Sequence, residues 1–153
     1  MDIAMQPIGV VRGGRDEAVD DHWGAVEASI DLDGTLLGPD ATAGLEDFSH
    51  LEVVFLFDRV GDGEITWSAR HPRGRTDWPA VGILAQRAKS RPNRIGVTLC
   101  ELVSVDGLAL RVRGLDAIDG TPVLDVKPYF SAFGPRGRVR EPTWVHELMR
   151  DYW

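Results

Sequence analysis

Cysteine, histidine and long apolar runs are all scarce in this 153-residue chain. One cysteine, Cys100, excludes an internal disulfide and a metal site made of several cysteines. The four histidines stand far apart, with neighbours unlike those of metal ligands, so we expect no bound metal. No apolar run approaches the length of a membrane span, and the N-terminal MDIAMQPIGVV lacks the apolar core of a signal peptide. We therefore expect a cytoplasmic protein with no membrane partner.

Motifs of several common enzyme classes are also missing. The chain has no Gly-x-Gly-x-x-Gly after a strand, no P-loop, no His-Glu-x-x-His and no serine flanked by glycines. These absences argue against a Rossmann nucleotide fold, a P-loop nucleotidase, a zinc protease and a serine hydrolase. Cys100 lies in the apolar run Val97–Val105, where a buried structural thiol is a better interpretation than a nucleophile.

The net charge of −7 is unevenly distributed along the chain. Residues 1–66 contain 3 basic and 15 acidic residues, whereas residues 67–153 contain 14 basic and 9 acidic ones. Phosphate binding needs a cationic surface, so binding of nucleic acid by the whole surface is disfavoured. The second half of the chain could still form a local basic face.

Short apolar segments separated by turn residues predict an all-β fold. Asp106-Gly107 between two apolar alternations indicates a tight hairpin, and Pro142 begins a helix with an apolar stripe. We expect one domain over residues 1–153, a small antiparallel β-barrel with its loops over 1–140 and a short C-terminal helix over 141–153. The expected strands are 3–12, 26–32, 51–57, 65–69, 81–86, 95–105, 108–113 and 122–127.

Two of these strands carry charged residues that are candidates for a functional site. The most hydrophobic run, Leu51–Phe57 (LEVVFLF), predicts a central strand buried on both faces. It ends in Asp58-Arg59, and charges at the end of a buried strand can point into a site. Asp125 and Lys127 lie two residues apart on another expected strand, and therefore on the same side of it.

A basic stretch between two apolar segments, Gly82–Gly96 (GILAQRAKSRPNRIG), is a candidate anion site. Pro92 fixes its own φ and favours an extended Arg91, so we expect a structured loop here rather than a helix. Several cations held together suit a carboxylate, a phosphate or a nucleotide, although a solvated basic surface has the same pattern. The cations are Arg87, Lys89, Arg91 and Arg94.

Five segments together resemble one known family. They are PIGVVR near the N-terminus, LEDFSHLEVVFLF, RHPRGR followed by VGILAQR, RPNRIGV, and LDAIDGTPVLDVKPY. In this order they are similar to the TsaA-like (YaeB/VirR) family over essentially the whole chain. The resemblance implies an all-β barrel that acts as an S-adenosylmethionine-dependent tRNA methyltransferase on N6 of threonylcarbamoyl-adenosine, next to the anticodon. It also implies a homodimer with its cofactor, S-adenosyl-L-methionine, near the subunit interface.

The resemblance also implies roles for individual residues. Arg87 would hold the donor's carboxylate or an anion of the acceptor, and Asp125 and His71 are the candidates for the catalytic base. The cofactor residues carried over are His22, Trp23, Asp58, Arg59, Arg87, Val97, Asp119, Gly120, Thr121, Pro122 and Val123. The residues expected to bind the methyl acceptor are Arg73, Lys89, Arg91, Asn93, Lys127 and Tyr129.

Three positions differ from the family's tRNA enzymes. His22-Trp23 replaces a Pro-Arg-Gln type of sequence, Asp58 replaces a histidine, and Ala88-Lys89 replaces a Ser-Pro or Ser-Thr pair. The resemblance therefore supports the methyl donor more strongly than it supports tRNA as the acceptor. Two alternatives stay open: a methyltransferase with a small-molecule acceptor, and a non-catalytic module that binds a nucleotide or RNA with the same loops.

Overall fold

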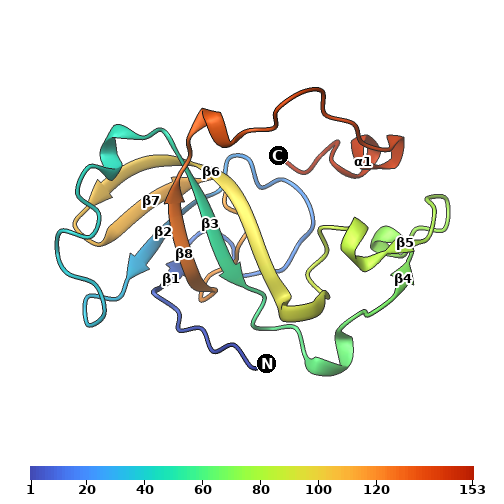
Figure 1. Ribbon diagram of the computed structural model, residues 1–153, viewed down its shortest axis with the longest axis horizontal. Helices are drawn as coiled ribbons and strands as arrows, with labels where there is room; N and C mark the ends of the chain where they lie inside the picture. The colour runs from blue at the N-terminus through green and yellow to red at the C-terminus, as the bar shows by residue number, and fades with distance from the viewer.

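Six segments in which inward and outward side chains alternate form a closed antiparallel barrel in the computed structural model, which describes residues 1–153. The strand order around the barrel is β1-β2-β7-β6-β3-β8 (Figure 1). The predicted small antiparallel β-barrel is confirmed. Its strands are β1 (Gly9–Arg12), β2 (Glu27–Leu32), β3 (His50–Leu56), β6 (Ile95–Asp106), β7 (Ala109–Arg113) and β8 (Pro122–Pro128).

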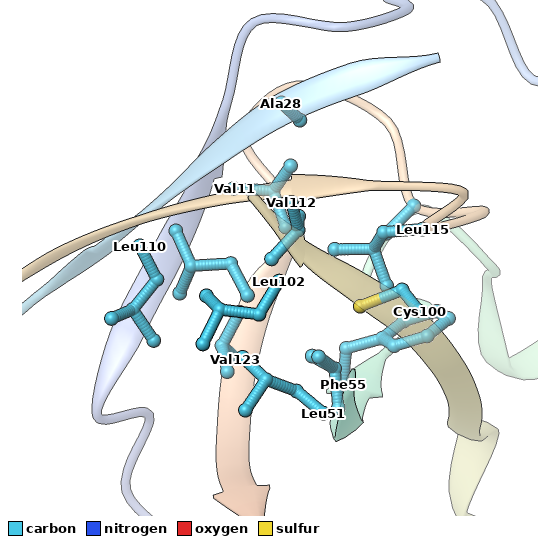
Figure 2. Packing of buried hydrophobic residues seen from close by; sticks show 13 residues of the cluster. Val11, Ala28, Leu51, Phe55, Cys100, Leu102, Leu110, Val112, Leu115 and Val123 are labelled. Atoms are coloured by element: carbon cyan, nitrogen blue, oxygen red, sulfur yellow. The ribbon is translucent and has the colours of Figure 1, made fainter. Parts of the chain in front are cut away.

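Inward-facing apolar side chains fill the barrel with a single cluster of 13 buried residues (Figure 2). On β3 the inward residues are Leu51, Val53 and Phe55, each at most 1% exposed. The residues between them are only half-buried, so the prediction that Leu51–Phe57 is buried on both faces is wrong. A barrel strand has one inner and one outer face, and only the inner face of β3 belongs to the core.

β6 and β7 form a hairpin whose two-residue loop is Gly107-Leu108. Asp106 pairs with Ala109, and Gly107 adopts a left-handed backbone with φ 58° that glycine accepts without strain. The hairpin prediction is confirmed, with its turn one residue later than Asp106-Gly107.

The connection between β3 and β6 leaves the barrel and has little regular structure. It contains a two-stranded ribbon of β4 (Ala69–Arg70) and β5 (Val81–Gly82), drawn to the right of the barrel in Figure 1. The strands predicted at 65–69 and 81–86 are therefore wrong in length. Each finds a partner for only two residues, because the barrel offers this excursion no free edge.

The C-terminal helix α1 (Thr143–Leu148) has six residues and is shorter than the predicted helix over 141–153. It lies beside the β4–β5 excursion rather than inside the barrel (Figure 1). The rings of Trp144 and Trp78 are 6.4 Å apart, and Trp78 Nε1 donates a hydrogen bond to Glu147 Oε2 at 2.7 Å. So short a helix is unstable alone, so these contacts hold it in place.

Phe55 and Gly96 form a steric pair between β3 and β6 that yields a stability prediction. The two residues are register partners, and a Cβ added at position 96 would lie 2.4 Å from the Phe55 ring. The ring is buried and cannot move aside, so Gly96→Ala should reduce the free energy of unfolding by about 1–3 kcal/mol, the usual cost of overpacking. Urea denaturation measures the change.

Gly63→Ala is the matched control. A Cβ at position 63 meets nothing within 4 Å, so this variant should unfold close to wild type. Equal stability of the two variants would show that the Phe55–Gly96 contact does not constrain the barrel.

Candidate active site

Antiparallel pairing brings the loops with most of the predicted site residues to one end of the barrel. β3 is antiparallel to both β6 and β8, so its last residues lie beside their first ones: Leu56 pairs with Ile95, and Phe55 with Val123. β1 also ends beside the start of β8. The connections 13–26, 57–94 and 114–121 therefore meet at this end, which we call the loop end.

The turn Asp119-Gly120 is fixed at the loop end by the segment that follows β1. The Asp119 carboxylate accepts a hydrogen bond from Gly13 N–H at 2.8 Å, and the Asp119 N–H donates to the Arg15 carbonyl at 2.7 Å. The Arg59 guanidinium donates to the carbonyls of Asp119 and Asp16 at 3.3 and 3.4 Å. Arg59 and Asp119, two predicted cofactor residues, are thus brought together.

The turn Asp119-Gly120 has fewer hydrogen-bonding groups available to a ligand than its sequence indicates. The N–H groups of Asp119, Gly120 and Thr121 all donate to carbonyls within the chain. The side chains of Thr121 and Val123 are buried, Val123 in the barrel core, because the same segment closes the barrel against β1. A ligand could reach the carbonyl oxygens, the half-buried Asp119 carboxylate and the half-buried Pro122 here.

His22 and Trp23 lie on the β1–β2 connection with different exposures. Trp23 is buried, with the Arg15 guanidinium 4.7 Å above its ring and its Nε1 donating to the Val19 carbonyl at 3.1 Å. The indole therefore stabilises its own loop instead of offering a face to a ligand. His22 is exposed and has a left-handed φ of 66°.

The basic stretch Gly82–Gly96 is the structured, non-helical loop that was predicted. It contains only two short 3-10 turns, Ile83–Ala85 and Pro92–Arg94. Arg91 is extended before Pro92, with φ −116° and ψ 158°, as expected.

The cations of this stretch differ in whether they have an acidic partner. Arg94 pairs with Asp62 at 3.3 Å. In contrast, Arg87 Nη2 donates to the Val97 carbonyl at 2.5 Å, and Arg91 Nη1 donates to a carbonyl at 2.6 Å. Neither of these arginines nor Lys89 forms an ion pair. Three positive charges are therefore free to attract an anion.

Asp116 is a candidate site residue that the sequence did not predict. Its carboxylate is half-buried and accepts hydrogen bonds from the hydroxyls of Thr98 and Tyr152. Burial and the charge of Asp116 raise the pKa of Tyr152, and the positive charges of Arg73 and Arg87 oppose that shift. The Tyr152 hydroxyl thus contacts the Asp116 carboxylate, and its pKa is also affected by the charges of two arginines. The available signal was a lone acid between two apolar residues in LDA.

Residues 150–153, which we call the C-terminal strap, lie against the loop end. The N–H groups of His22 and Trp23 donate to the carbonyls of Asp151 and Tyr152, both at 2.8 Å. Gly24 approaches Trp153 so closely that an added Cβ would lie 2.7 Å from its carbonyl carbon. The strap therefore contacts the predicted cofactor loop at His22-Trp23 and the Asp116 carboxylate.

The two predicted catalytic bases lie in different environments. Asp125 forms an ion pair with Lys127 at 2.5 Å, which confirms that they share one side of β8. Asp125 pairs with Val54 in the middle of the strand and so lies on the barrel wall. His71 Nδ1 lies 2.7 Å from the Trp78 carbonyl; because a carbonyl only accepts, Nδ1 carries a proton, and in the neutral ring the lone pair is on Nε2.

The residues expected to bind the acceptor are divided between the two ends of the barrel. Lys127 and Tyr129 lie toward the end opposite the loop end, since the neighbouring Pro128 pairs with Leu51. Arg73 pairs with Asp21 at 2.9 Å, and Asn93 is exposed with φ 63°. Arg73, Lys89, Arg91 and Asn93 all lie on the 57–94 connection that also carries Arg87.

Other features bear on which ligands would fit. A hollow of about 510 Å³ beside His22 is lined by four carboxylates and would repel an anion. No group of three histidine, cysteine, aspartate or glutamate side chains is placed to hold a metal ion. None of the helices could cross a membrane.

Residues 20–134 match the family model described as the tRNA-methyltransferase O N-terminal domain. The chain belongs to this family. Every site residue predicted above, from His22 to Tyr129, falls within the matched range.

Named relatives and a solved structure agree with this membership. A human tRNA (adenine(37)-N6)-methyltransferase is 39% identical over 65% of this chain, and the chain spans only 22% of that relative. A Pyrococcus abyssi protein, named a probable S-adenosyl-L-methionine-binding protein, is 36% identical over 90% of the chain and 74% of its own length. A crystal structure of TrmO superimposes with a TM-score of 0.75 at 28% identity, covering 92% of this chain and 64% of that one.

The environment of Cys100 gives a reactivity prediction. Burial, with the nearby charge of Asp116, raises the pKa of this thiol to about 12, and the residue is 3% exposed. The thiolate is the nucleophile, so native protein at pH 8 should react with iodoacetamide more than about a hundredfold slower than urea-unfolded protein. Mass spectrometry follows the modification. Similar rates in the two states would contradict the structural role of this thiol.

Proposed function

We propose that this protein is an S-adenosyl-L-methionine-dependent methyltransferase that modifies N6 of adenosine 37 in tRNA. The supporting observation is the family match over residues 20–134, which includes the connections 57–94 and 114–121 and the part of 13–26 that contains His22 and Trp23. Two relatives of the chain are named for methylation of that nucleoside or for binding of that donor. Since the chain spans a minor part of the mammalian relatives, the whole reaction belongs to the proposal.

The residues present fit the methyl donor. Arg87 has no carboxylate partner and is oriented by the Val97 carbonyl, so its free N–H groups suit the donor's α-carboxylate. The sulfonium of the donor, when bound, supplies an already activated methyl group. The chain must therefore align the acceptor and accept one proton.

Among the proposed bases, His71 suits proton removal better than Asp125. The Trp78 carbonyl orients the His71 ring and fixes the proton on Nδ1, which leaves Nε2 free to accept a proton. Asp125 is already neutralised by Lys127 on the outside of β8. We therefore assign the base role to His71.

The charge distribution supports a specific form of the acceptor, threonylcarbamoyl-adenosine in tRNA. This nucleoside has a carboxylate of its own next to the modified nitrogen, and tRNA adds phosphates on both sides. Lys89 and Arg91 lie close in sequence to Arg87 and are not neutralised by ion pairs, so they could bind these anions. An enzyme that modifies tRNA in this way would work in the cytoplasm.

A non-catalytic module that binds S-adenosyl-L-methionine is the second candidate function, favoured by the name of the Pyrococcus relative. A methyltransferase with a small-molecule acceptor is a third. Incubation with methyl-labelled S-adenosyl-L-methionine and bulk tRNA separates them, because only the proposed enzyme transfers label to RNA. Nuclease digestion of the product should give a labelled N6-methylated, threonylcarbamoylated adenosine.

Removing the Arg87 guanidinium tests the donor site. Arg87→Ala should weaken binding of S-adenosyl-L-homocysteine by about 1.5–3 kcal/mol, the value of a hydrogen bond to a charged group, as measured by titration calorimetry. Thermal melting should stay unchanged, since Arg87 is exposed.

Arg111→Ala is the matched control, because it removes an exposed arginine from the barrel wall, where Arg111 pairs with Glu27. Unchanged affinity in a folded Arg87→Ala protein would assign Arg87 to the solvated surface. If wild-type protein binds neither the donor nor its product below millimolar concentration, the methyltransferase proposal fails.

We further propose that the protein acts as a homodimer. Its outer surface exposes a row of apolar side chains on β6, Val97, Leu99 and Val103, and two-fold pairing is the usual way to cover such a row. Val97 is also the residue that orients Arg87, so a partner here would stand beside the donor site.

Sedimentation of wild-type protein should therefore give twice the 16.9 kDa chain mass, and Leu99→Asp should shift it toward one chain mass. Val139→Asp, an exposed apolar residue on a loop, is the control and should leave the dimer intact. A monomeric wild-type protein that binds the donor would contradict the shared site.

A further inference from the structure

Asp116 is a half-buried carboxylate whose hydrogen-bond partners are hydroxyl groups instead of cations. Both oxygens are occupied, one by the Thr98 hydroxyl and one by the Tyr152 hydroxyl. No ion pair of the chain includes Asp116. A partly desolvated carboxylate gains most from a cationic hydrogen-bond donor, so this site has an unmet preference for positive charge.

Arg87, by contrast, is a cation without an anionic partner. Arg87 is held by the carbonyl of Val97, the residue before Thr98, and has no carboxylate partner. The charges of Arg87 and Asp116 both act on the Tyr152 hydroxyl. One free cation and one carboxylate without a cation, close together, match an α-amino acid group with its carboxylate and its ammonium. The methionine portion of the methyl donor ends in such a group.

We propose that Asp116 binds the α-ammonium group of the methyl donor and that the Tyr152 hydroxyl takes its place in the free protein. The proposal rests on the proposed function, because it assumes that this site binds S-adenosyl-L-methionine. Arg87 then holds the α-carboxylate, and the C-terminal strap competes with the donor for Asp116.

The exchange is chemically favourable and requires little movement. An ammonium has a full charge and three N–H donors, whereas the phenol offers one neutral O–H. The Thr98 hydroxyl keeps its bond to Asp116 throughout. The backbone bonds from His22 and Trp23 to the strap also survive, so only the Tyr152 side chain has to leave.

Two variants with opposite expected effects test this assignment by titration calorimetry. The probes are S-adenosyl-L-homocysteine and 5′-methylthioadenosine, which carry the same nucleoside with and without the amino acid group. Asp116→Asn should weaken binding of S-adenosyl-L-homocysteine at least about tenfold and change 5′-methylthioadenosine by less than about twofold. Tyr152→Phe removes only the competing hydroxyl and should tighten S-adenosyl-L-homocysteine about threefold or more.

Asp33→Asn is the matched control, because the Asp33 carboxylate also accepts from a threonine hydroxyl but lies after β2, outside the loop end. It should leave both affinities unchanged. Structural damage could not produce the tightening expected of Tyr152→Phe, so that variant keeps the test valid if Asp116→Asn is unstable.

Other results would overturn the assignment. Equal weakening of both probes by Asp116→Asn would mean that Asp116 supports the loop and does not bind the ammonium. Unchanged binding in Asp116→Asn, or weaker binding in Tyr152→Phe, would also reject it while leaving the proposed function intact. Failure of wild-type protein to bind either probe would instead reject the proposed function, and this assignment with it.

Discussion

The position of β3 between β6 and β8 determines where every other part of the site lies. Both neighbours run antiparallel to β3, so the residues that follow β3 must meet those that precede β6 and β8. Tight packing fixes this register, since the buried Phe55 ring occupies the space that the missing Gly96 side chain leaves. A slip of one residue would turn the core side chains of β3 outward. The three connections of the loop end are therefore brought together by the packing of the core.

Charged side chains on the barrel wall and in the loops differ in whether they form ion pairs. On the barrel wall they neutralise one another, as Glu27 does with Arg111 and Arg113 at 2.5 and 2.6 Å. These exposed pairs contribute little to stability, but they leave the wall without a net attraction for anions. In the loops, Arg87 and Arg91 are oriented by carbonyls, which hold a guanidinium without cancelling its charge. The chain, although acidic overall, thus has unpaired positive charge in the loops where the ligand is expected.

The sequence predicted those features that depend on local pattern. Short apolar segments between turn residues located the six barrel strands, Pro92 predicted an extended Arg91, and a period of two placed Asp125 beside Lys127. It could not indicate that Trp23 is covered by its own loop, because that depends on how the loop folds back on itself. Nor could it indicate that the N–H groups of Asp119 and Gly120 donate to the carbonyls of Arg15 and Val11, because those residues lie far away in the sequence. Asp116 was missed for the same reason, since Thr98 and Tyr152 lie 18 and 36 residues away from it.

The contact between Tyr152 of the C-terminal strap and Asp116 is weak enough for a ligand to replace. Helix α1 has only six residues and gives the strap little rigidity of its own. The bond between Tyr152 and Asp116, a hydrogen bond to a charged group, contributes about 1.5–3 kcal/mol. A ligand with micromolar affinity gains about 8 kcal/mol on binding. Because the second quantity is much larger than the first, release of one tyrosine side chain lowers the affinity of a donor without preventing its binding. A contact of this strength suits a residue that protects an unpaired carboxylate until a cationic ligand arrives.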